Sequence, residues 1–357
     1  MKSDYWPHNT CLYVTDFLGN EPKFASYFLD ALGLASYNSG SAQPSLNRNF
    51  IYTKPITVPP PKEQRAIAHI LGTLDDKIEL NRRQSETLQE MARALFKAWF
   101  VDFEPVRAKM SGRWQRGQTL PGLPAHLWNL FPDRLVETEH GEVPQGWETV
   151  LLGDFIETVK GRSYKSTELA PSTTALVTLK SFARGGGYRA DGLKSYTGAY
   201  KPEQVVEPSE VVISCTDVTQ AAEVIGRAVI VRESKQYQTL VASLDTVIVR
   251  PRSERITRMF LYHLGRSERF VAHTCSHVTG TTVLHLAKNA IPSFQFPLPP
   301  QNLVHHFDEV AAGMFARVTA LEHEVEYIVA LRDALLPKLI SGELRIGEVN
   351  KFFRGEI

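Results

Sequence analysis

The chain has 357 residues, enough for two ordinary domains. Hydrophobic residues make up 43% and charged residues 22%, which excludes a disordered or low-complexity chain. No apolar run reaches the roughly 18 residues of a membrane span, and the first residues do not resemble a signal peptide. Three widely separated cysteines supply neither a disulfide framework nor a structural zinc site. We therefore expect a cytoplasmic protein with no membrane partner.

The net charge of +1 hides an uneven distribution of charge along the chain. Residues 160–201 contain eight lysines and arginines but two acidic residues, and residues 250–269 contain six arginines and two glutamates. Basic stretches of this kind are typical of a surface that contacts phosphates. The alternative, slightly favoured by charge alone, is two solvated faces.

An internal repeat gives both halves of the chain the same predicted order of elements. Gly40 aligns with Gly280 at an offset of 240 residues, and Leu12-Tyr13-Val14 aligns with Val247-Ile248-Val249 at an offset of 235. Each copy predicts an apolar strand and an aromatic helix (24–32; 259–264). A polar loop, a β-like segment ending in prolines (56–61; 294–300) and a long helix follow in each copy.

The two long helices carry heptad patterns. Apolar residues step by four and three from Ile67 to Trp99, and again from Phe307 to Leu339, so we predict an intramolecular coiled coil about 60 Å long. The alternative is that each helix packs on its own globular part. Pro337 is expected to interrupt the second helix near its end. The seam residues that we assign to partner binding are Ile67, Leu74, Leu88, Leu95, Trp99, Val318, Leu321, Ile328 and Leu335.

Residues 104–145 indicate an ordered connector, and short β-like runs from residue 147 to residue 291 indicate a mixed α/β domain. No phosphate-binding loop, metalloprotease motif or methyl-donor loop is present. The glycine-rich run from Arg184 to Arg189 ends in a turn, so we interpret it as a loop that approaches a phosphodiester rather than a dinucleotide site; an inert turn is the alternative. His273, Cys275 and His277 lack a fourth zinc ligand and are interpreted as ordinary loop residues.

Three segments carry a resemblance to a known family. Residues 59–68 (PPPKEQRAIA) with 74–78 (LDDKI) look like the start of a helical spacer, and residues 336–344 (LPKLISGEL) look like its C-terminal end. Residues 144–147 (PQGW) followed by 152–154 (LGD) resemble the opening of a target-recognition domain. Together they resemble the specificity subunits of type I restriction–modification systems.

The resemblance implies the fold and the partners. Its fold class is α+β, with mixed α/β target-recognition domains joined by two long antiparallel coiled-coil helices, each domain reading half of a split double-stranded DNA site. It implies two modification subunits that methylate adenine, and restriction subunits that cleave DNA. Catalysis and the cofactors S-adenosylmethionine, ATP and Mg are expected on those partners, and none on this chain.

The expected domains are a C-terminal remnant of the first recognition domain (1–58), a spacer helix (59–103), a connector (104–146), the second recognition domain (147–298), a spacer helix (299–345) and a tail (346–357). The front of the first recognition domain is expected to be missing. The chain is then a truncation, a short form that works as a homodimer, or a scaffold that no longer selects DNA.

The leading hypothesis is a DNA-specificity subunit without catalysis of its own. Arginine and lysine can read guanine, asparagine and glutamine can read adenine, and hydroxyl groups hold phosphates. The rivals are an assembly protein that acts through its coiled coil, and a self-sufficient DNA enzyme, which the missing motifs disfavour. The expected DNA-binding residues are Lys180, Arg184, Gly186, Tyr188, Arg189, Thr216, Thr219, Gln220, Thr281, Thr282, Ser39, Ser41 and Gln43.

Overall fold

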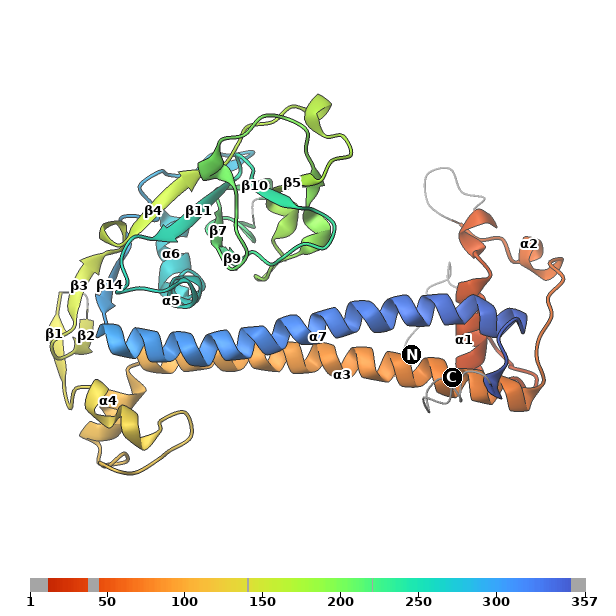
Figure 1. Ribbon diagram of the computed structural model, residues 1–357, viewed down its shortest axis with the longest axis horizontal. Coiled ribbons are helices and arrows are strands. Elements are labelled where there is room, and N and C mark those ends of the chain that lie inside the picture. The colour runs from red at the N-terminus through yellow and green to blue at the C-terminus, as the bar shows by residue number, and fades with distance from the viewer. Residues whose placement is uncertain (1–11, 38–44, 140, 220, 348–357) are drawn as a thin grey trace. The chain divides into compact units, whose positions relative to one another are not determined.

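The computed structural model describes residues 12–37, 45–139, 141–219 and 221–347. Packing divides the chain into two compact units (Figure 1). The helical unit comprises residues 1–88 and 316–357, and the sheet unit comprises residues 89–315. Two long helices, α3 (Pro61–Phe100) and α7 (Gln301–Ser341), contribute residues to both units.

The helical unit consists of short helices packed on an antiparallel helix pair. Its short helices are α1 (Pro22–Ala31), α2 (Arg48–Tyr52) and the 3-10 helix at Leu34–Tyr37. The aromatic face of α1, with Phe24 and Phe28, packs against Ile67 of α3 and Leu339 of α7. Residues near the start of α3 pack against residues near the end of α7. The two helices therefore run antiparallel within this unit.

Polar contacts fix the position of α1 on the helix pair. The Tyr27 hydroxyl donates to the Asp75 carboxylate, which also accepts from Arg332 Nη1 at 2.9 Å. Gln64, in the segment that follows the prolines, is only 1% exposed. Its amide nitrogen donates to Asn20 Oδ1 at 2.7 Å, and its oxygen accepts from the Glu21 backbone at 2.9 Å. These contacts tie the start of α1 to the start of α3.

The sheet unit contains three further α-helices and a set of small sheets. The helices are α4 (Glu104–Met110), α5 (Arg258–Leu264) and α6 (Glu268–Ser276). The strands are β1 (Leu135–Thr138), β2 (Gly141–Pro144), β3 (Glu148–Leu151), β4 (Ile156–Lys160), β5 (Thr174–Val177), β6 (Lys194–Ser195), β7 (Val211–Ser214), β8 (Thr216–Asp217), β9 (Ala228–Ile230), β10 (Thr239–Ala242), β11 (Thr246–Pro251), β12 (Val278–Thr279), β13 (Leu284–Leu286) and β14 (Gln295–Leu298). The 3-10 helices lie at 125–130, 152–154, 166–168, 179–181, 190–192 and 202–204.

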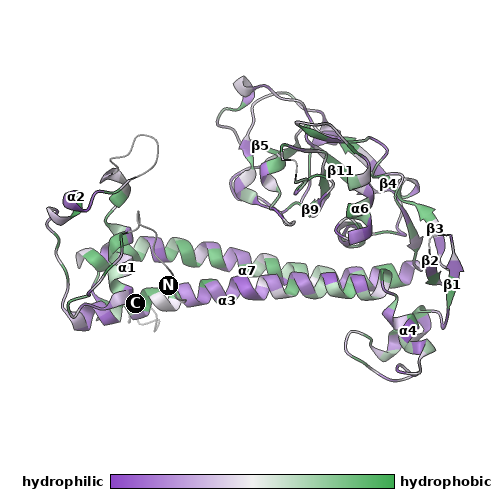
Figure 2. Cartoon of the chain, turned by 180° about the vertical axis from the view of Figure 1, so that it is seen from behind, coloured by the Kyte–Doolittle hydropathy of each residue, from purple (hydrophilic) through white to green (hydrophobic). Residues whose placement is uncertain are grey.

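A four-stranded antiparallel sheet in the order β4-β11-β7-β9 forms the centre of this unit. Strands β7, β9 and β11 are mostly hydrophobic in colour in Figure 2, because both of their faces are buried, whereas the edge strand β4 is largely exposed. Side chains alternate between the faces, so Val211 and Ile213 enter one core while Val212 enters the other. The second core also contains Ala175 of the sheet β10-β5-β6. This burial explains why the strands read as continuous apolar runs.

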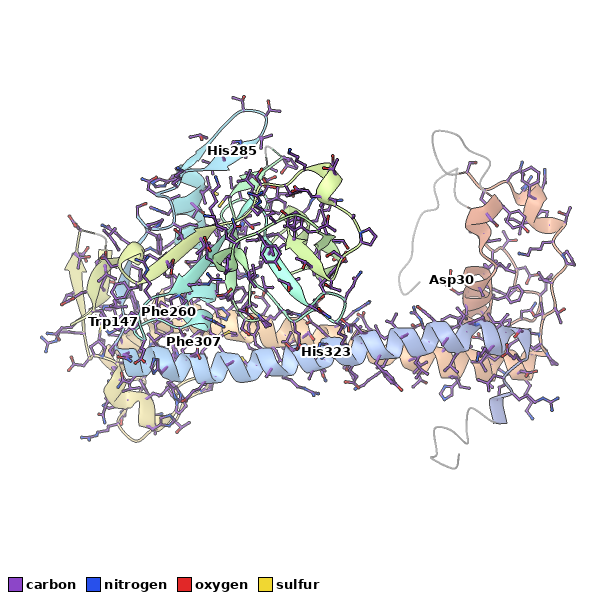
Figure 3. All side chains as sticks on the ribbon, turned by 45° about the horizontal axis from the view of Figure 1, so that its top comes forward. Asp30, Trp147, Phe260, His285, Phe307 and His323 are labelled. Carbon is purple, nitrogen blue, oxygen red and sulfur yellow. The ribbon has the colours of Figure 1, made fainter. Side chains whose placement is uncertain are left out.

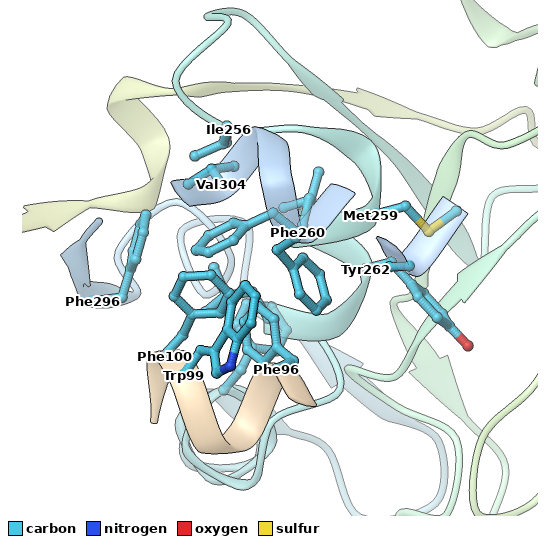
Figure 4. Close-up of a cluster of buried hydrophobic side chains, with 14 of the residues drawn as sticks. Phe96, Trp99, Phe100, Ile256, Met259, Phe260, Tyr262, Phe296 and Val304 are labelled. Carbon is cyan, nitrogen blue, oxygen red and sulfur yellow. The ribbon is translucent and has the colours of Figure 1, made fainter. Parts of the chain in front are cut away.

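The first core is largely aromatic. Phe96 and Phe100 of α3 meet Phe260 of α5 with ring centroids 5.3 and 5.1 Å apart (Figure 4). Phe307 at the start of α7 lies 5.4 Å from both α3 rings, in edge-to-face geometry. Trp147 stacks against the same cluster, 6.2 Å from Phe100. Segments separated by about 200 residues in sequence therefore share one core.

The predicted fold class is confirmed, whereas two details of the repeat are wrong. Both long helices form, and the expected aromatic helices are α1 and α5. However, Leu12–Val14 forms no strand, and neither does the segment 56–60. Their aligned counterparts, in β11 and β14, are paired with β4, β7 and β3, and the described residues of the helical unit supply no such partner strands.

Pro337 does not interrupt α7, contrary to our expectation, because the helix continues to Ser341. The last turns are held by packing, since Leu339 is 2% exposed in the core of the helical unit. Gly342 then adopts φ +75°, a left-handed conformation that ends helices and favours glycine. The boundaries of the six domains that we expect from the sequence stay a prediction.

Candidate nucleic-acid interface

A polar cleft of about 740 Å³ opens on the sheet unit and contains four of the predicted DNA-binding residues. Lys180, Arg184 and Arg189 line one side of it, and Thr219 lines the other. Except for Thr219, which is partly buried, these side chains are exposed to solvent. The structure thus brings together residues from two loops that lie about 35 positions apart in sequence.

The first wall of the cleft is a glycine-rich loop closed by a bridge between Phe182 and Tyr188. Its three glycines, 185–187, have φ angles of +80°, +104° and +113°, which other residues adopt only with strain. Gly186 also packs over the Arg266 guanidinium, because a Cβ at this position would lie 3.1 Å from Nη2. Gly186 is therefore required by backbone geometry and close packing, which a DNA-contacting role alone would not explain.

The second wall is the loop 217–224, and the Asp217 carboxylate organises it. Asp217 is 2% exposed. Its Oδ1 accepts from the Thr219 backbone and hydroxyl, both at 2.8 Å, and its Oδ2 accepts from the Val224 backbone at 2.9 Å. These hydrogen bonds hold the pKa of Asp217 below its usual value despite desolvation by burial, which raises it. Val218, between the anchored residues, remains 70% exposed.

Ion pairs neutralise the arginines of the cleft. Arg184 Nε lies 3.1 Å from Glu223 Oε2, so this pair joins the two walls. Arg189 pairs with Asp191 two residues further along the same wall, and this contact lowers the pKa of the Asp191 carboxyl. The cleft therefore presents hydrogen-bond donors next to acceptors rather than a uniformly positive surface. Exposed pairs of this kind contribute about 0–1 kcal/mol, so they add little to the stability of the fold.

A hairpin adjoins the second wall. Strands β12 and β13 pair with each other, and β13 pairs with β8 so that His285 lies opposite Thr216. His285 lies in β13 and is exposed (Figure 3). The tip, with Thr281 and Thr282, is also exposed. The sheet β12-β13-β8 thus connects the hairpin to the strand that leads into the cleft.

Two of the predicted DNA-binding residues have structural roles that the sequence did not indicate. Thr216 is 7% exposed, and its hydroxyl donates to Asp245 Oδ1 at 2.9 Å, so it supports β8 instead of presenting a hydroxyl to DNA. The Tyr188 hydroxyl is buried, and burial raises its pKa to about 12. The remaining four, Ser39, Ser41, Gln43 and Gln220, lie outside the described residues.

Two arginines of the second basic stretch are engaged within the fold. Arg250 donates to both oxygens of Glu210, at 2.6 and 3.1 Å, and to two backbone carbonyls. Arg266 Nη1 donates to the Tyr262 hydroxyl at 2.6 Å. These arginines hold the sheet unit together, so counting charges along the sequence overestimates the basic surface.

Sequence reasoning missed the acidic side of the cleft. Glu223, Asp191 and Asp217 line it beside the predicted basic residues. The Asp-x-Thr spacing at 217–219 is a local signal for a side chain that hydrogen-bonds its own loop. The Glu223 pairing carries no such signal, because its partner comes from a different loop.

Comparison with known proteins agrees with this architecture. A family model for the type I restriction modification DNA specificity domain matches residues 1–90. The specificity subunit of the type I restriction enzyme MjaIX from Methanocaldococcus jannaschii is 26% identical over 320 residues, 88% of this chain and 66% of that protein. The HindI specificity subunit from Haemophilus influenzae is 24% identical over 349 residues, 87% of this chain and 73% of that protein. The chain is similar to type I restriction–modification specificity subunits over most of its length.

Solved structures with some likeness also come from this family. The HsdS subunit from Thermoanaerobacter tengcongensis is 17% identical, with a TM-score of 0.36, over 91% of this chain and 71% of that one. The type I restriction–modification S subunit from M. genitalium is 15% identical, with a TM-score of 0.46, over 91% of this chain and 74% of that one.

The seam residues that we assigned to partner binding are buried or half-buried within their own chain. Val318 and Leu321 are 0% exposed, Ile67 1%, Trp99 2%, Ile328 7% and Leu74 9%. Leu88, Leu95 and Leu335 are half-buried. Their first role is therefore to hold the chain's own helices, and partner binding by them stays a prediction.

Neither a metal site nor a membrane helix is found in the part of the chain that the structure describes. There, no cluster of three or more His, Cys, Asp or Glu side chains is placed to hold a metal ion. The His273 and His277 rings instead contact backbone carbonyls, each at 2.8 Å. Among the described helices, none is long and apolar enough to cross a bilayer.

Proposed function

We propose that this chain is the DNA-specificity subunit of a type I restriction–modification complex and acts in the cytoplasm on a split double-stranded DNA site. The observation that carries the proposal is the cleft of the sheet unit, where Lys180, Arg184, Arg189 and Thr219 meet. Arginine and lysine donors beside carboxylate acceptors are the groups that read base edges in the major groove. The match of residues 1–90 to the DNA specificity domain and the similarity to specificity subunits support the same reading.

The chain contributes recognition, and its partners contribute catalysis. Two modification subunits would carry S-adenosylmethionine and methylate adenine, and restriction subunits would use ATP and Mg. The long helix that ends each copy of the internal repeat supports this division, because an antiparallel helix pair can serve as a fixed spacer. At about 34 Å per DNA turn, helices of 40 and 41 residues match a spacing of roughly two turns.

The test is to express the full chain with its cognate modification subunit in a host free of adenine methylation. N6-methyladenine is then mapped across the host genome. A split motif is expected, and its loss when the modification subunit is expressed alone would assign the specificity to this chain.

The symmetry of the motif distinguishes the modes of action. A palindromic split motif would mean that two copies of the sheet unit act as a homodimer. An asymmetric motif would mean that the helical unit or a separately encoded segment completes the second half-site. Methylation without any motif would refute the proposal and favour a scaffold that acts through its helices.

A further inference from the structure

The Arg184–Glu223 pair differs from the other ion pair of the cleft because it joins the two walls. Arg189 pairs with Asp191 on its own loop, whereas Arg184 and Glu223 come from loops 182–188 and 217–224. The Arg184 side chain is 78% exposed and that of Glu223 is 38% exposed, so both are accessible to a ligand in the cleft. The anchored Asp217 carboxylate fixes the loop that presents Glu223.

The contact between the two side chains leaves a defined pattern of donors and acceptors. Arg184 forms the ion pair through Nε, which lies 3.1 Å from Glu223 Oε2. A guanidinium has five N–H donors, so the end of the fork, with its two Nη atoms, can still donate two parallel hydrogen bonds. The second carboxylate oxygen of Glu223 can accept another. From Arg184 to Glu223, the groups available to a ligand are therefore two donors, the Nη atoms, followed by one acceptor, the second carboxylate oxygen.

Only one orientation of base pair matches this pattern in the major groove. Guanine offers two neighbouring acceptors, N7 and O6, and its cytosine partner offers the N4 amino donor next to them. An A·T pair offers acceptor, donor, acceptor, which would place the adenine amino group against the arginine. The order acceptor, acceptor, donor of G·C is therefore complementary to the Arg184–Glu223 pair.

We propose that Arg184 and Glu223 act as one reading unit for a G·C base pair, with arginine on guanine and glutamate on the cytosine amino group. This inference rests on the proposed function, because it assigns a specificity to the same cleft. The ion pair would also hold the arginine fork in place before DNA binds, which lowers the entropy cost of reading.

The experiment begins with the sequences that the full wild-type chain selects from a random pool of duplex DNA. Each G·C pair of the selected site is then changed in turn, with 7-deazaguanine to remove N7 or N4-methylcytosine to block the amino group. At one pair, either change is expected to weaken wild-type binding roughly tenfold. Arg184→Ala should abolish the 7-deazaguanine effect, and Glu223→Gln should abolish that of N4-methylcytosine.

Arg184→Lys is the matched control for a phosphate contact. Lysine keeps the positive charge but loses the planar fork, so it should keep the salt dependence of binding and weaken the guanine preference. Both side chains changed here are accessible to solvent, so thermal unfolding of the three variants should remain that of the wild type. If Arg184→Ala keeps the 7-deazaguanine effect and Glu223→Gln keeps the N4-methylcytosine effect, the reading unit is refuted while the proposed function stands. If the wild-type chain selects no sequence, the proposed function itself fails.

Discussion

His263 makes the stability of the sheet unit sensitive to acid. The side chain is 3% exposed, and neither ring nitrogen has a hydrogen-bond partner. Its neighbours are aromatic rings, including Phe96 at 5.8 Å and Phe307 at 5.4 Å. Burial, together with the positive charges of Arg266 and Arg93, lowers the pKa of His263 from 6.5 to about 3. The folded protein therefore holds this ring neutral.

The direction of the pH effect follows from this shift. Below pH 6.5 the unfolded chain binds a proton at this histidine, whereas the folded chain does not until about pH 3. Acid thus favours the unfolded state. The contribution of His263 to stability should fall by about 1.4 kcal/mol between pH 7.5 and 5.5, and by about 2.7 kcal/mol by pH 4.5.

The assay is urea unfolding of wild type and His263→Leu between pH 7.5 and 4.5. The effects of other titrating groups cancel in the difference between variant and wild type. As the pH falls below 6.5, the free energy of unfolding of the variant relative to wild type should therefore rise by about 1.4 kcal/mol per pH unit. Parallel profiles for wild type and His263→Leu would refute the reasoning.

Three further predictions concern buried polar groups and close packing. Asn81 is 0% exposed in the helix seam with no hydrogen-bond partner for its amide, although it lies close enough to Glu324 to lower that carboxyl's pKa. Asn81→Leu should raise the free energy of unfolding by about 1–3 kcal/mol in urea titrations, and loss of stability would contradict this. Glu210→Gln should lower it by about 3 kcal/mol, because it leaves the Arg250 charge uncompensated; a change below about 0.5 kcal/mol would count against a structural role for the pair. Gly192→Ala should lower the thermal midpoint, since a Cβ there would overlap the Lys180 carbonyl, and an unchanged midpoint would show that this backbone can move.

The long helices could be predicted from sequence because their signal is local and repeated. A heptad pattern needs no knowledge of the partner, and Ile67, Leu71 and Ile78 are buried where the pattern places them. Asn81 and Ser85 are also buried in the seam, although both side chains are polar. The Ser85 hydroxyl donates to the Asn81 carbonyl at 3.0 Å, which satisfies it within its own helix.

The strands of the first repeat could not be predicted in the same way, because a strand forms only where another strand pairs with it. Leu12–Val14 has the same apolar character as its counterpart in β11, yet its side chains are 55%, 59% and 47% exposed. Similarly, the residue types of the cleft were visible in the sequence, but the pairing of Arg184 with Glu223 depends on how two loops are folded toward each other.

The aromatic core of the sheet unit has a consequence for the order in which the chain folds during synthesis. Phe96 and Phe100 leave the ribosome long before Phe260 and Phe307, on which they pack. At about 5–20 residues per second, the α3 aromatics would wait roughly 10–40 s for their partners. Over that interval, this apolar segment is a binding site for chaperones and a starting point for aggregation, and the nascent chain needs protection until α7 begins to emerge.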